Sequence, residues 1–314
     1  MNTYLLAVLI FVVSGVVVWA MSFIVEALRA APPAPEKLSW APEIPMSYVS
    51  VNGNRVRYIK TGQGPTLLLL HTLRTQLDLF QKVIPKLSKH FTVYAVDYPG
   101  HGYSDIPKAT YGAYFFADFV EDFMDEMDLR DVTLSGVSIG GAISLILAGR
   151  QNSRVVRVLA INPYDYAKGR GMGRSSALGA MIMYTALVPV LGETIMRLRN
   201  FIIMKAVLNG GVAESKSIPP ALMKEMYNVG NRTGHYRAFA RLLRNAASWQ
   251  SAAATYGSIR IPVTLMWGMQ DWSKVNEREH DHTLIPGAKV VTVEHGGHFL
   301  PLDRPDAIIK QLQK

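Results

Sequence analysis

The sequence predicts an α/β protein: a mostly parallel β-sheet flanked by helices, with a helical insertion and an apolar helix at the N-terminus. Short continuous apolar runs alternate with longer segments of helical periodicity, which is typical of strands buried on both faces. Residues 164–256 break that alternation, because only helical patterns occur there. An uncharged apolar run at the N-terminus precedes the alternating segments and the helical insertion. These three observations define the fold class and the order of the domains.

The N-terminal segment is long and apolar enough to cross a bilayer. Residues 1–25 carry no charge, and Tyr4–Val25, at about 1.5 Å per helical residue, spans about 33 Å against a hydrocarbon core of about 30 Å. A cleaved signal peptide is the main alternative, but the segment lacks a basic N-terminal region and a small-residue cleavage site. The prediction is a retained single-pass membrane anchor over residues 1–28.

The residues after the apolar run predict a linker and an orientation. Five prolines between residues 29 and 46 indicate a stiff, extended chain, because proline fixes φ and lacks a backbone N–H. Arg29 and Lys37 follow the anchor, whereas nothing basic precedes it. The positive-inside rule therefore favours a cytoplasmic location for the residues that follow the anchor.

The α/β core is predicted over residues 47–163 and 257–314. A hairpin begins it, because period-two alternation surrounds the turn at Asn52-Gly53. Buried strands are expected at Leu67–Leu70, Phe91–Val96, Val132–Leu134, Val155–Ile161, Val263–Trp267 and Val290–Val293, and helices at Thr75–Ser88, Tyr111–Met127, Ile139–Arg150, Val275–Leu284 and Pro305–Leu312. This alternation requires a parallel sheet with helices on both sides.

Residues 164–256 are predicted to form a helical cap. Helices are expected at Ala180–Val188, Thr194–Leu208, Ala221–Val229 and Tyr236–Trp249, and no clear strand appears between Asn162 and Tyr256. Open α/β sheets bind ligands at the carboxyl edge of their strands. An insertion there is expected to cover the substrate pocket as a lid.

The distribution of charge favours a lipid surface over nucleic acid as partner. Eight of the nine net positive charges arise from residues 164–256, which hold 12 Lys and Arg against 4 Asp and Glu. The same segment holds seven of the fourteen methionines and lacks basic repeats interleaved with aromatic residues. We therefore expect membrane lipids as partners and no nucleic acid. A methionine core and a solvated basic face would explain the same composition.

Ser138 is the predicted nucleophile. The strand from Val132 runs into Gly136-Val137-Ser138-Ile139-Gly140 and then into a helix, which fits the G-x-S-x-G nucleophile elbow in its strand–turn–helix context. Side chains at Gly136 and Gly140 would collide with the neighbouring backbones. The N–H of Ile139 is then at a helix N-terminus, where it can donate to a developing oxyanion.

A serine nucleophile needs a base near neutral pH, and the base needs an acid that fixes its tautomer. His298 lies in a glycine-rich loop after the last strand and is the predicted base, with His295 as the second candidate. Asp271 ends the preceding strand and is the predicted acid. Asp165, beyond the strand that ends at Ile161, is the alternative acid, because a triad is defined by geometry and not by chain position.

Four motifs in register resemble those of α/β-hydrolase-fold enzymes. They are the elbow, the D-x-P-G-x-G-x-S turn at Asp97–Ser104, Trp267-Gly268-x-x-Asp271 and Gly297-His298-Phe299. The resemblance covers about Ser47–Gln313, with a helical cap inserted between the two parts of the α/β core. It implies acyl-enzyme hydrolysis through Ser138, Asp271 and His298, and it implies that Asp97 and His101 are structural.

The stretch after the third strand departs from the family pattern. The family usually has H-G and small residues there, whereas this chain has His71-Thr72-Leu73-Arg74-Thr75, without glycine. The stretch is similar to N-S-L-G-T of enol-lactonase-like members, except that Arg74 replaces the glycine. The resemblance implies that the amide of Leu73 completes the oxyanion hole with that of Ile139. Arg74 is interpreted either as a solvated loop residue or as a contact to an acidic substrate group.

Other chemistries are disfavoured. The chain has no cysteine, which excludes disulfides, thiolate metal sites and a cysteine nucleophile. Ser138 occupies the place of the aspartate that haloalkane dehalogenase-like and epoxide hydrolase-like relatives use. Gly169–Gly173 lacks the spacing of a dinucleotide site. His280 and His282 do not share a helix face, so they are not expected to bind one metal ion together. No cofactor and no metal are therefore predicted.

The sequence thus predicts a membrane-anchored serine hydrolase that cleaves a hydrophobic acyl ester. A lipid-like ester such as a monoacylglycerol or a lysophospholipid is the first expectation, because the anchor and the methionine-rich basic cap suit an amphiphilic substrate. The alternative is a small-molecule catabolic hydrolase of the same fold that acts on a lactone, a thioester or a carbon–carbon bond. The third hypothesis is a non-catalytic membrane scaffold.

Overall fold

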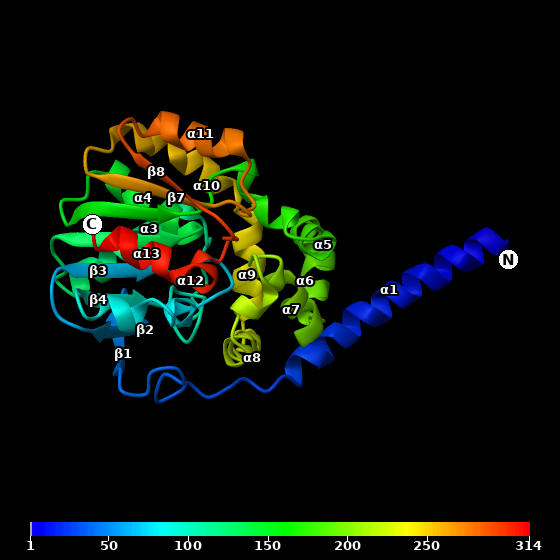
Figure 1. Ribbon diagram of the computed structural model, residues 1–314. Coiled ribbons are helices and arrows are strands. Elements are labelled where there is room, and N and C mark those ends of the chain that lie inside the picture. Colours follow the sequence, from blue (N-terminus) through cyan, green and yellow to red (C-terminus); the bar gives the residue numbers. More distant parts are fainter. Residues whose placement is uncertain (1) are drawn as a thin grey trace.

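An eight-stranded mixed sheet forms the centre of the molecule (Figure 1), in a computed structural model that describes residues 2–314. The strands are β1 (Met46–Val51), β2 (Asn54–Thr61), β3 (Thr66–Leu70), β4 (Thr92–Val96), β5 (Val132–Val137), β6 (Val155–Ile161), β7 (Val263–Gly268) and β8 (Lys289–Val293). Their order across the sheet is β1-β2-β4-β3-β5-β6-β7-β8. The predicted hairpin is β1–β2, and β2 is also antiparallel to β4. Every other pair is parallel.

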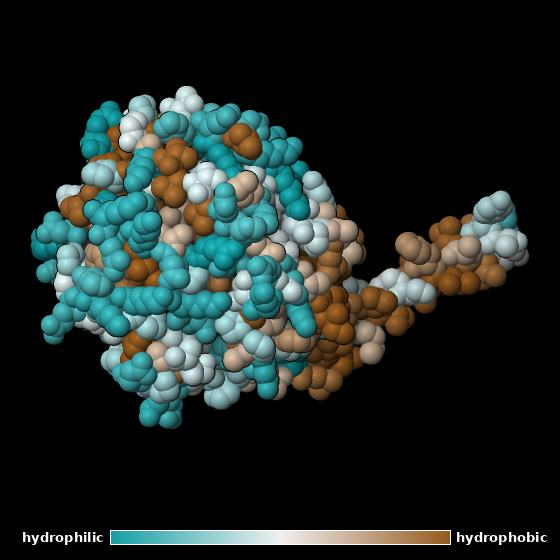
Figure 2. All heavy atoms as spheres, in the orientation of Figure 1, coloured by the Kyte–Doolittle hydropathy of each residue, from teal (hydrophilic) through white to brown (hydrophobic). Residues whose placement is uncertain are grey.

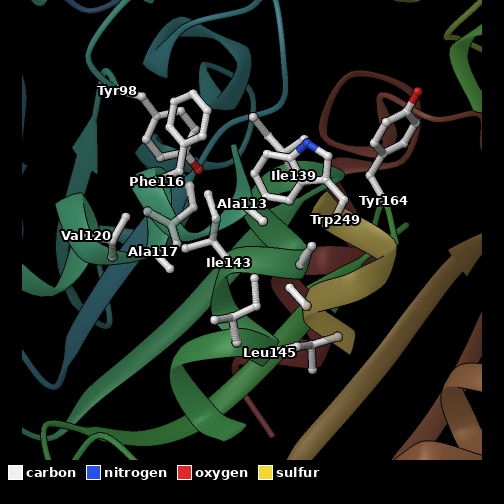
Figure 3. Packing of buried hydrophobic residues seen from close by; sticks show 14 of the residues in the cluster. Tyr98, Ala113, Phe116, Ala117, Val120, Ile139, Ile143, Leu145, Tyr164 and Trp249 are labelled. Atoms are coloured by element: carbon white, nitrogen blue, oxygen red, sulfur yellow. The ribbon is translucent and has the colours of Figure 1, made fainter. Parts of the chain in front are cut away.

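Helices cover both faces of the sheet, because the parallel strands are apolar on both faces. Leu68 and Leu70 of β3 point into one core, and Leu67 and Leu69 into the other. The first core includes α3 (Ala113–Glu126), α4 (Ile139–Gly149) and α10 (Ala247–Ala252), where the ring of Phe116 stacks on Trp249 at 5.9 Å (Figure 3). The second core includes α12 (Leu300–Asp303) and α13 (Pro305–Leu312). α11 (Val275–Leu284) flanks β7 and β8 (Figure 1).

The prediction of one helix over Thr75–Ser88 is wrong. The chain forms a 3₁₀ turn, η1 (Leu77–Phe80), and one short helix, α2 (Ile84–Leu87). A buried ionic network holds this irregular path: Arg57 pairs with Asp78 and Asp97, and Asp97 accepts the N–H of Leu77 at 2.8 Å. Satisfying three buried charges outweighs the local preference for a longer helix.

All the regular secondary structure between β6 and β7 is helical, as predicted. The helices are α5 (Ala177–Thr185), α6 (Pro189–Arg197), α7 (Phe201–Asn209), α8 (Pro220–Val229), α9 (His235–Arg244) and α10, with 3₁₀ turns η2 (Ala167–Gly169), η3 (Gly171–Arg174), η4 (Ser215–Ser217) and η5 (Ala253–Ser258). The single helix expected over Thr194–Leu208 is broken, because Asn200 caps α7 by accepting the N–H of Ile203. The helix expected over Tyr236–Trp249 likewise divides into α9 and α10. We use the name cap for residues 164–256.

The N-terminal helix α1 (Thr3–Ala27) projects away from the rest of the molecule, and its apolar side chains are exposed along almost its whole length (Figures 1 and 2). By length and composition it can cross a membrane. The proline-rich segment that follows is not uniformly extended, contrary to the prediction, because it contains bends and turns between residues 36 and 44 and packs on the core. Leu38, Ala41 and Ile44 are buried there, and the indole N–H of Trp40 donates to Asp78.

The carboxyl end of α1 is docked on the cap. Arg197 of α6 is buried, donates to Ser22 Oγ at 2.9 Å, and lies over the ring of Phe23 with its guanidinium carbon 3.9 Å from the centroid. Glu26 pairs with Arg199 at 2.6 Å. Arg29 extends the contact, because its guanidinium donates to the carbonyls of Arg197 and Arg199. Helix and cap are therefore joined by buried polar contacts.

Candidate active site

The elbow between β5 and α4 holds Ser138 in a strained conformation, with φ 60° and ψ −117°. Such a turn requires the adjacent glycines. A Cβ at Gly136 would overlap the backbone of Gly140, and a Cβ at Gly140 would overlap the carbonyl of Leu70 at the end of β3. The two glycines therefore let α4 begin directly against β5 and β3, which fixes Ser138 at the carboxyl edge of the sheet.

Asp271 and His298 are joined by a short hydrogen bond of 2.5 Å between Oδ1 and Nδ1, and both side chains are buried. The other oxygen of Asp271 accepts the N–H of Ser273 at 2.8 Å. Burial opposes ionisation of Asp271, but the adjacent His298 and these hydrogen bonds outweigh it and lower the pKa of Asp271. The carboxylate can therefore hold the imidazole with its Nδ1 as donor, which leaves Nε2 able to accept a proton.

Ser138 and His298 lie at the same edge of the sheet, and Tyr164 contacts both. Its N–H donates to the carbonyl of Ser138 at 3.2 Å, and its ring centroid is 6.0 Å from that of His298. Within residues 2–314, Ser138 Oγ and His298 Nε2 are buried and have no hydrogen-bond partner. Hydrogen bonds of catalytic groups commonly form only when substrate is bound. Ser138 Oγ and His298 Nε2, between which a proton would be transferred, are therefore both free of other hydrogen bonds in the described chain.

Sequence reasoning missed Asn162, which connects the segments that hold Asp271 and His298. Its amide nitrogen donates to the carbonyls of Gly297 and His298, each at 3.0 Å, and its amide oxygen accepts the N–H of Gly268 at 2.9 Å. The side chain thereby ties the loop of His298 to the end of β7, three residues before Asp271. Its position directly after β6, at the ligand-binding edge, is the only signal in the sequence.

Trp272 was also missed. Its ring stacks on His298 with centroids 3.7 Å apart and planes within 12°, and its indole N–H donates to the carbonyl of Gly210 in the cap. The indole thus restricts the imidazole to one plane and joins the base to the cap. No motif indicates such a role, because Trp272 is simply the residue after the acid.

The amides assigned to the oxyanion hole lie on adjacent segments. Ile139 is the first residue of α4, so its N–H has no carbonyl partner within the helix. The N–H of Leu73 donates to no residue in the part of the chain that the structure describes. The close approach of Leu70 to Gly140 brings the two segments together. This arrangement can supply two donors to one oxygen atom.

Arg74 is not a solvated loop residue, although the sequence allowed that interpretation. It has φ 62°, Nη1 lies 2.8 Å from Nδ1 of His235, and its guanidinium faces the ring of Phe239. Burial, with repulsion from Arg199 and Arg29, lowers the pKa of Arg74 to about 9. Burial likewise keeps the pKa of His235 well below its usual value, so a neutral imidazole accepts from the arginine.

A cavity of about 90 Å³ lies between the cap and the catalytic edge of the sheet. Its lining is apolar except for two guanidinium groups and one phenol. The lining residues are Leu73, Arg74, Met172, Met181, Ile182, Ile195, Met196, Arg199, Ile203, Met204, Val207, Leu208, Tyr236, Phe239, Trp272 and Phe299. Leu73 and Trp272 place this cavity next to the candidate oxyanion hole and base, so it is suited to hold an apolar substituent of a substrate.

Asp165, the alternative acid, is engaged elsewhere. It accepts the hydroxyl of Tyr256 at 2.7 Å and faces Asp281 of α11. Burial, together with the charge of Asp165, strongly raises the pKa of Asp281. Two buried carboxyl groups in contact retain a proton between them. The structure therefore pairs His298 with Asp271 and gives Asp165 a structural contact.

We expect Asp281→Asn to stabilise the protein more at about pH 9 than at about pH 5. A carboxyl group with a raised folded pKa contributes stability that is fully present below its unfolded pKa, and this stability is lost progressively as the pH rises from the unfolded pKa to the folded pKa. Asparagine supplies a permanent N–H donor to Asp165, so the loss disappears. Thermal unfolding should show a difference of about 1 kcal/mol or more between the two pH values. A pH-independent difference would contradict the shared proton.

The remaining sequence candidates lie in other surroundings. His295 is exposed and makes no contact with Asp271 in the described chain. Asp97 accepts from Arg57 and from the N–H of Tyr103 at 2.8 Å, as expected for a structural turn. His101 is buried, and burial lowers its pKa to about 3. These groups hold the loop beside the site and do not face His298.

The chain belongs to the alpha/beta hydrolase fold family, whose pattern matches residues 65–305. A carboxylesterase of Bacillus subtilis, YbfK, is 24% identical over 274 residues, which cover 86% of each chain. An uncharacterized protein of Mycobacterium tuberculosis is 26% identical over 283 residues, which cover 86% of this chain and 80% of the relative.

Solved structures show the same fold. Cfl2 of Burkholderia cenocepacia has a TM-score of 0.76 at 19% identity, over 90% of this chain and 99% of the other. The enol-lactonase of Burkholderia xenovorans has a TM-score of 0.65 at 23% identity, over 85% and 98%. Relatives also include a haloalkane dehalogenase of Mesorhizobium japonicum, 28% identical over 63% of this chain and 60% of that relative. The family therefore includes hydrolases of several chemistries.

Proposed function

We propose that this protein is a membrane-anchored serine hydrolase that cleaves a carboxylic ester with an apolar acyl group. The observation that carries the proposal is the buried Asp271–His298 pair, at the same sheet edge as a serine held on a strained glycine-flanked turn. That combination supplies a nucleophile, a base and the group that orients the base. The carboxylesterase among the relatives is in line with it.

The proposed reaction has two halves. His298 Nε2 takes the hydroxyl proton of Ser138 as Oγ attacks the ester carbonyl, and Asp271 stabilises the imidazolium through Nδ1. The amides of Ile139 and Leu73 donate to the oxyanion. The imidazolium protonates the leaving alcohol, and the acyl group remains on Ser138. A water molecule, deprotonated by His298, then releases the carboxylic acid and restores the enzyme.

A lipid-like substrate is supported by the cavity and by α1. The cavity has four methionines in its lining, and thioether side chains adapt to flexible acyl chains. α1 is long and apolar enough to hold the enzyme at a bilayer as a single-pass anchor, with the catalytic domain on the cytoplasmic side. Monoacylglycerols and lysophospholipids carry one acyl chain and partition into membranes. They are the proposed substrate class.

A second candidate is a small-molecule hydrolase of the same site. Arg74 favours it, since the guanidinium lines the cavity beside the candidate oxyanion hole and could bind a carboxylate of a compact substrate. The enol-lactonase among the similar structures fits that chemistry. A chain-length series of p-nitrophenyl esters separates the two candidates. A rise in kcat/KM with acyl length supports the lipid ester, and a preference for acetyl supports the compact substrate.

Reaction of the intact protein with a fluorophosphonate probe tests the serine mechanism. We expect stoichiometric labelling, and peptide mass spectrometry should find the probe on Ser138, because only a serine activated by a base attacks the phosphorus. Protein denatured before addition of the probe is the control and should not react. A folded protein that never labels would favour the non-catalytic scaffold.

A further inference from the structure

The cap carries an extended apolar surface beside α1. Thirteen large hydrophobic side chains beyond residue 28 are exposed in the described chain, and eight of them lie between Met181 and Ile202. They are Met181, Tyr184, Leu187, Val188, Val190, Leu191, Phe201 and Ile202, and we call them the cap face. The other five lie on the core: Met269, Val275 and Val290 line one surface pocket, and Tyr114 and Val156 lie on other elements. Figure 2 shows hydrophobic residues gathered on the cap next to the base of α1.

The cap face is almost free of charge. Between Met181 and Ile202 the charged residues are Glu193, which pairs with Arg244 at 3.2 Å and with Arg197 at 3.6 Å, and two arginines, Arg197 and Arg199, whose side chains are only 2% and 9% exposed. An apolar surface of this extent is costly in water and marks an interaction site. Its helices also lack the alternating charges that solvate an ordinary surface helix.

The position of α1 identifies the partner. Arg197, at the end of α6, lies against Ser22 and Phe23, so α6 packs on the carboxyl end of the apolar helix. The residues from Thr3 to Met21 extend beyond this contact and, at about 1.5 Å each, span about 28 Å, close to one hydrocarbon core. The contact with the cap therefore falls where the helix leaves the bilayer. The cap face continues the apolar surface of α1 at that level.

We propose that the cap face is embedded in the interfacial layer of the bilayer, so that the lid is a membrane-contacting element and the acyl chain enters the cavity from the lipid. The proposal rests on the proposed anchoring by α1 and deepens it by assigning the route of the substrate. The occupant of this surface is the lipid, whose acyl region matches a surface of exposed Val, Leu, Ile and Phe.

The cavity and the cap face share the same helices. Met181 belongs to both, since it lines the cavity and is 42% exposed. The cavity is also lined by one half-buried isoleucine from each of α5, α6 and α7, namely Ile182, Ile195 and Ile203. An acyl chain that leaves the lipid between these helices thus passes from one apolar environment to another and does not cross water. Leu73 and Trp272 line the same cavity, and Trp272 stacks on His298.

The chain lacks native cysteine, which permits a direct test on the full-length protein. Val190→Cys and Ile202→Cys introduce a single thiol on the cap face, at residues outside the cavity lining. Each variant is labelled with an environment-sensitive fluorophore and reconstituted in phosphatidylcholine–phosphatidylglycerol vesicles. Two quenchers are compared: lipids with a spin label on the acyl chain, and iodide in the water.

Two matched variants give the reference values. Phe11→Cys lies at the middle of α1, and Val156→Cys is an exposed valine at the amino end of β6, the sheet edge opposite the cap. We expect the lipid quencher to remove most of the fluorescence at Val190 and Ile202, as at Phe11, and iodide to quench only Val156. Hydrolysis of a short soluble ester should stay at the wild-type rate, because the substituted residues do not line the cavity.

The other outcomes separate the hypotheses. Quenching of Val190 and Ile202 by iodide, with Phe11 still quenched by lipid, overturns the embedded cap and leaves the anchor intact. Protection of Val190 and Ile202 from both quenchers indicates a protein contact, such as a second copy of the chain, and also overturns the embedded cap. Quenching of Phe11 by iodide overturns the anchor itself and with it the embedded cap. The serine mechanism is tested separately by the fluorophosphonate reaction.

Discussion

Replacement of Ser138 by alanine is expected to lower kcat for ester hydrolysis by about 10⁶-fold, as happens in a serine protease without its nucleophile. No other hydroxyl is held on the elbow, so no acyl-enzyme can form. Turnover of a p-nitrophenyl ester and labelling by the fluorophosphonate measure the loss, and both should disappear together. The fold should persist, because the change removes one buried oxygen atom that has no partner in the described chain.

Ser135→Ala is the matched control for that experiment. Ser135 is buried three residues earlier, in β5, and its hydroxyl also has no hydrogen-bond partner within residues 2–314. Loss of that hydroxyl should leave kcat within a few-fold of wild type, since it is not on the elbow. Undiminished turnover by Ser138→Ala would require a different nucleophile and would remove the basis of the proposed mechanism.

The second large effect is expected from Asp271→Asn, which should lower kcat by about 10⁴-fold with little change in KM. The amide keeps the shape of the carboxyl group and one oxygen for the N–H of Ser273. The amide nitrogen, however, donates to Nδ1 of His298 and stabilises the wrong tautomer, so that Nε2 carries the proton and cannot act as base. Steady-state kinetics with a soluble ester measure the split between kcat and KM.

Asp165→Asn provides the comparison, because Asp165 was the alternative acid. Its carboxyl group contacts Tyr256 and Asp281 and not the imidazole. We expect kcat to stay within a few-fold of wild type, whereas thermal stability and its pH dependence change. The reverse pattern, with a large loss at Asp165 and none at Asp271, would show that the working enzyme uses another acid.

Much of the fold could be predicted from the sequence, because local patterns and global structure agree there. The hairpin follows from Asn52-Gly53, and the buried strands follow from apolar runs. The elbow could be located because Gly136 and Gly140 are required by contacts with their immediate neighbours. The pairing of Asp271 with His298 could be predicted because each follows a strand that ends at the same edge.

The rest depends on contacts between residues far apart in the chain. The ionic network of Arg57 overrides the helical pattern over residues 75–88, and no local signal reveals it. Asn162 and Trp272 hold the base through side-chain contacts that no motif records. The cap face was also beyond sequence reasoning, because composition does not show which methionines and valines face a cavity and which face outward.

For the proposed membrane anchor, the contacts at residues 22–29 also determine how freely the core and the cap can turn relative to α1. A flexible tether would let the catalytic domain tumble, and most encounters with substrate would present the wrong side. Here Glu26 and Arg29 hold the helix to the cap, and Leu38 and Ile44 hold the following segment to the core. The orientational entropy that each encounter would cost is instead lost once, during folding, so a protein anchored by α1 as proposed would present the same side in every collision within the plane of the bilayer.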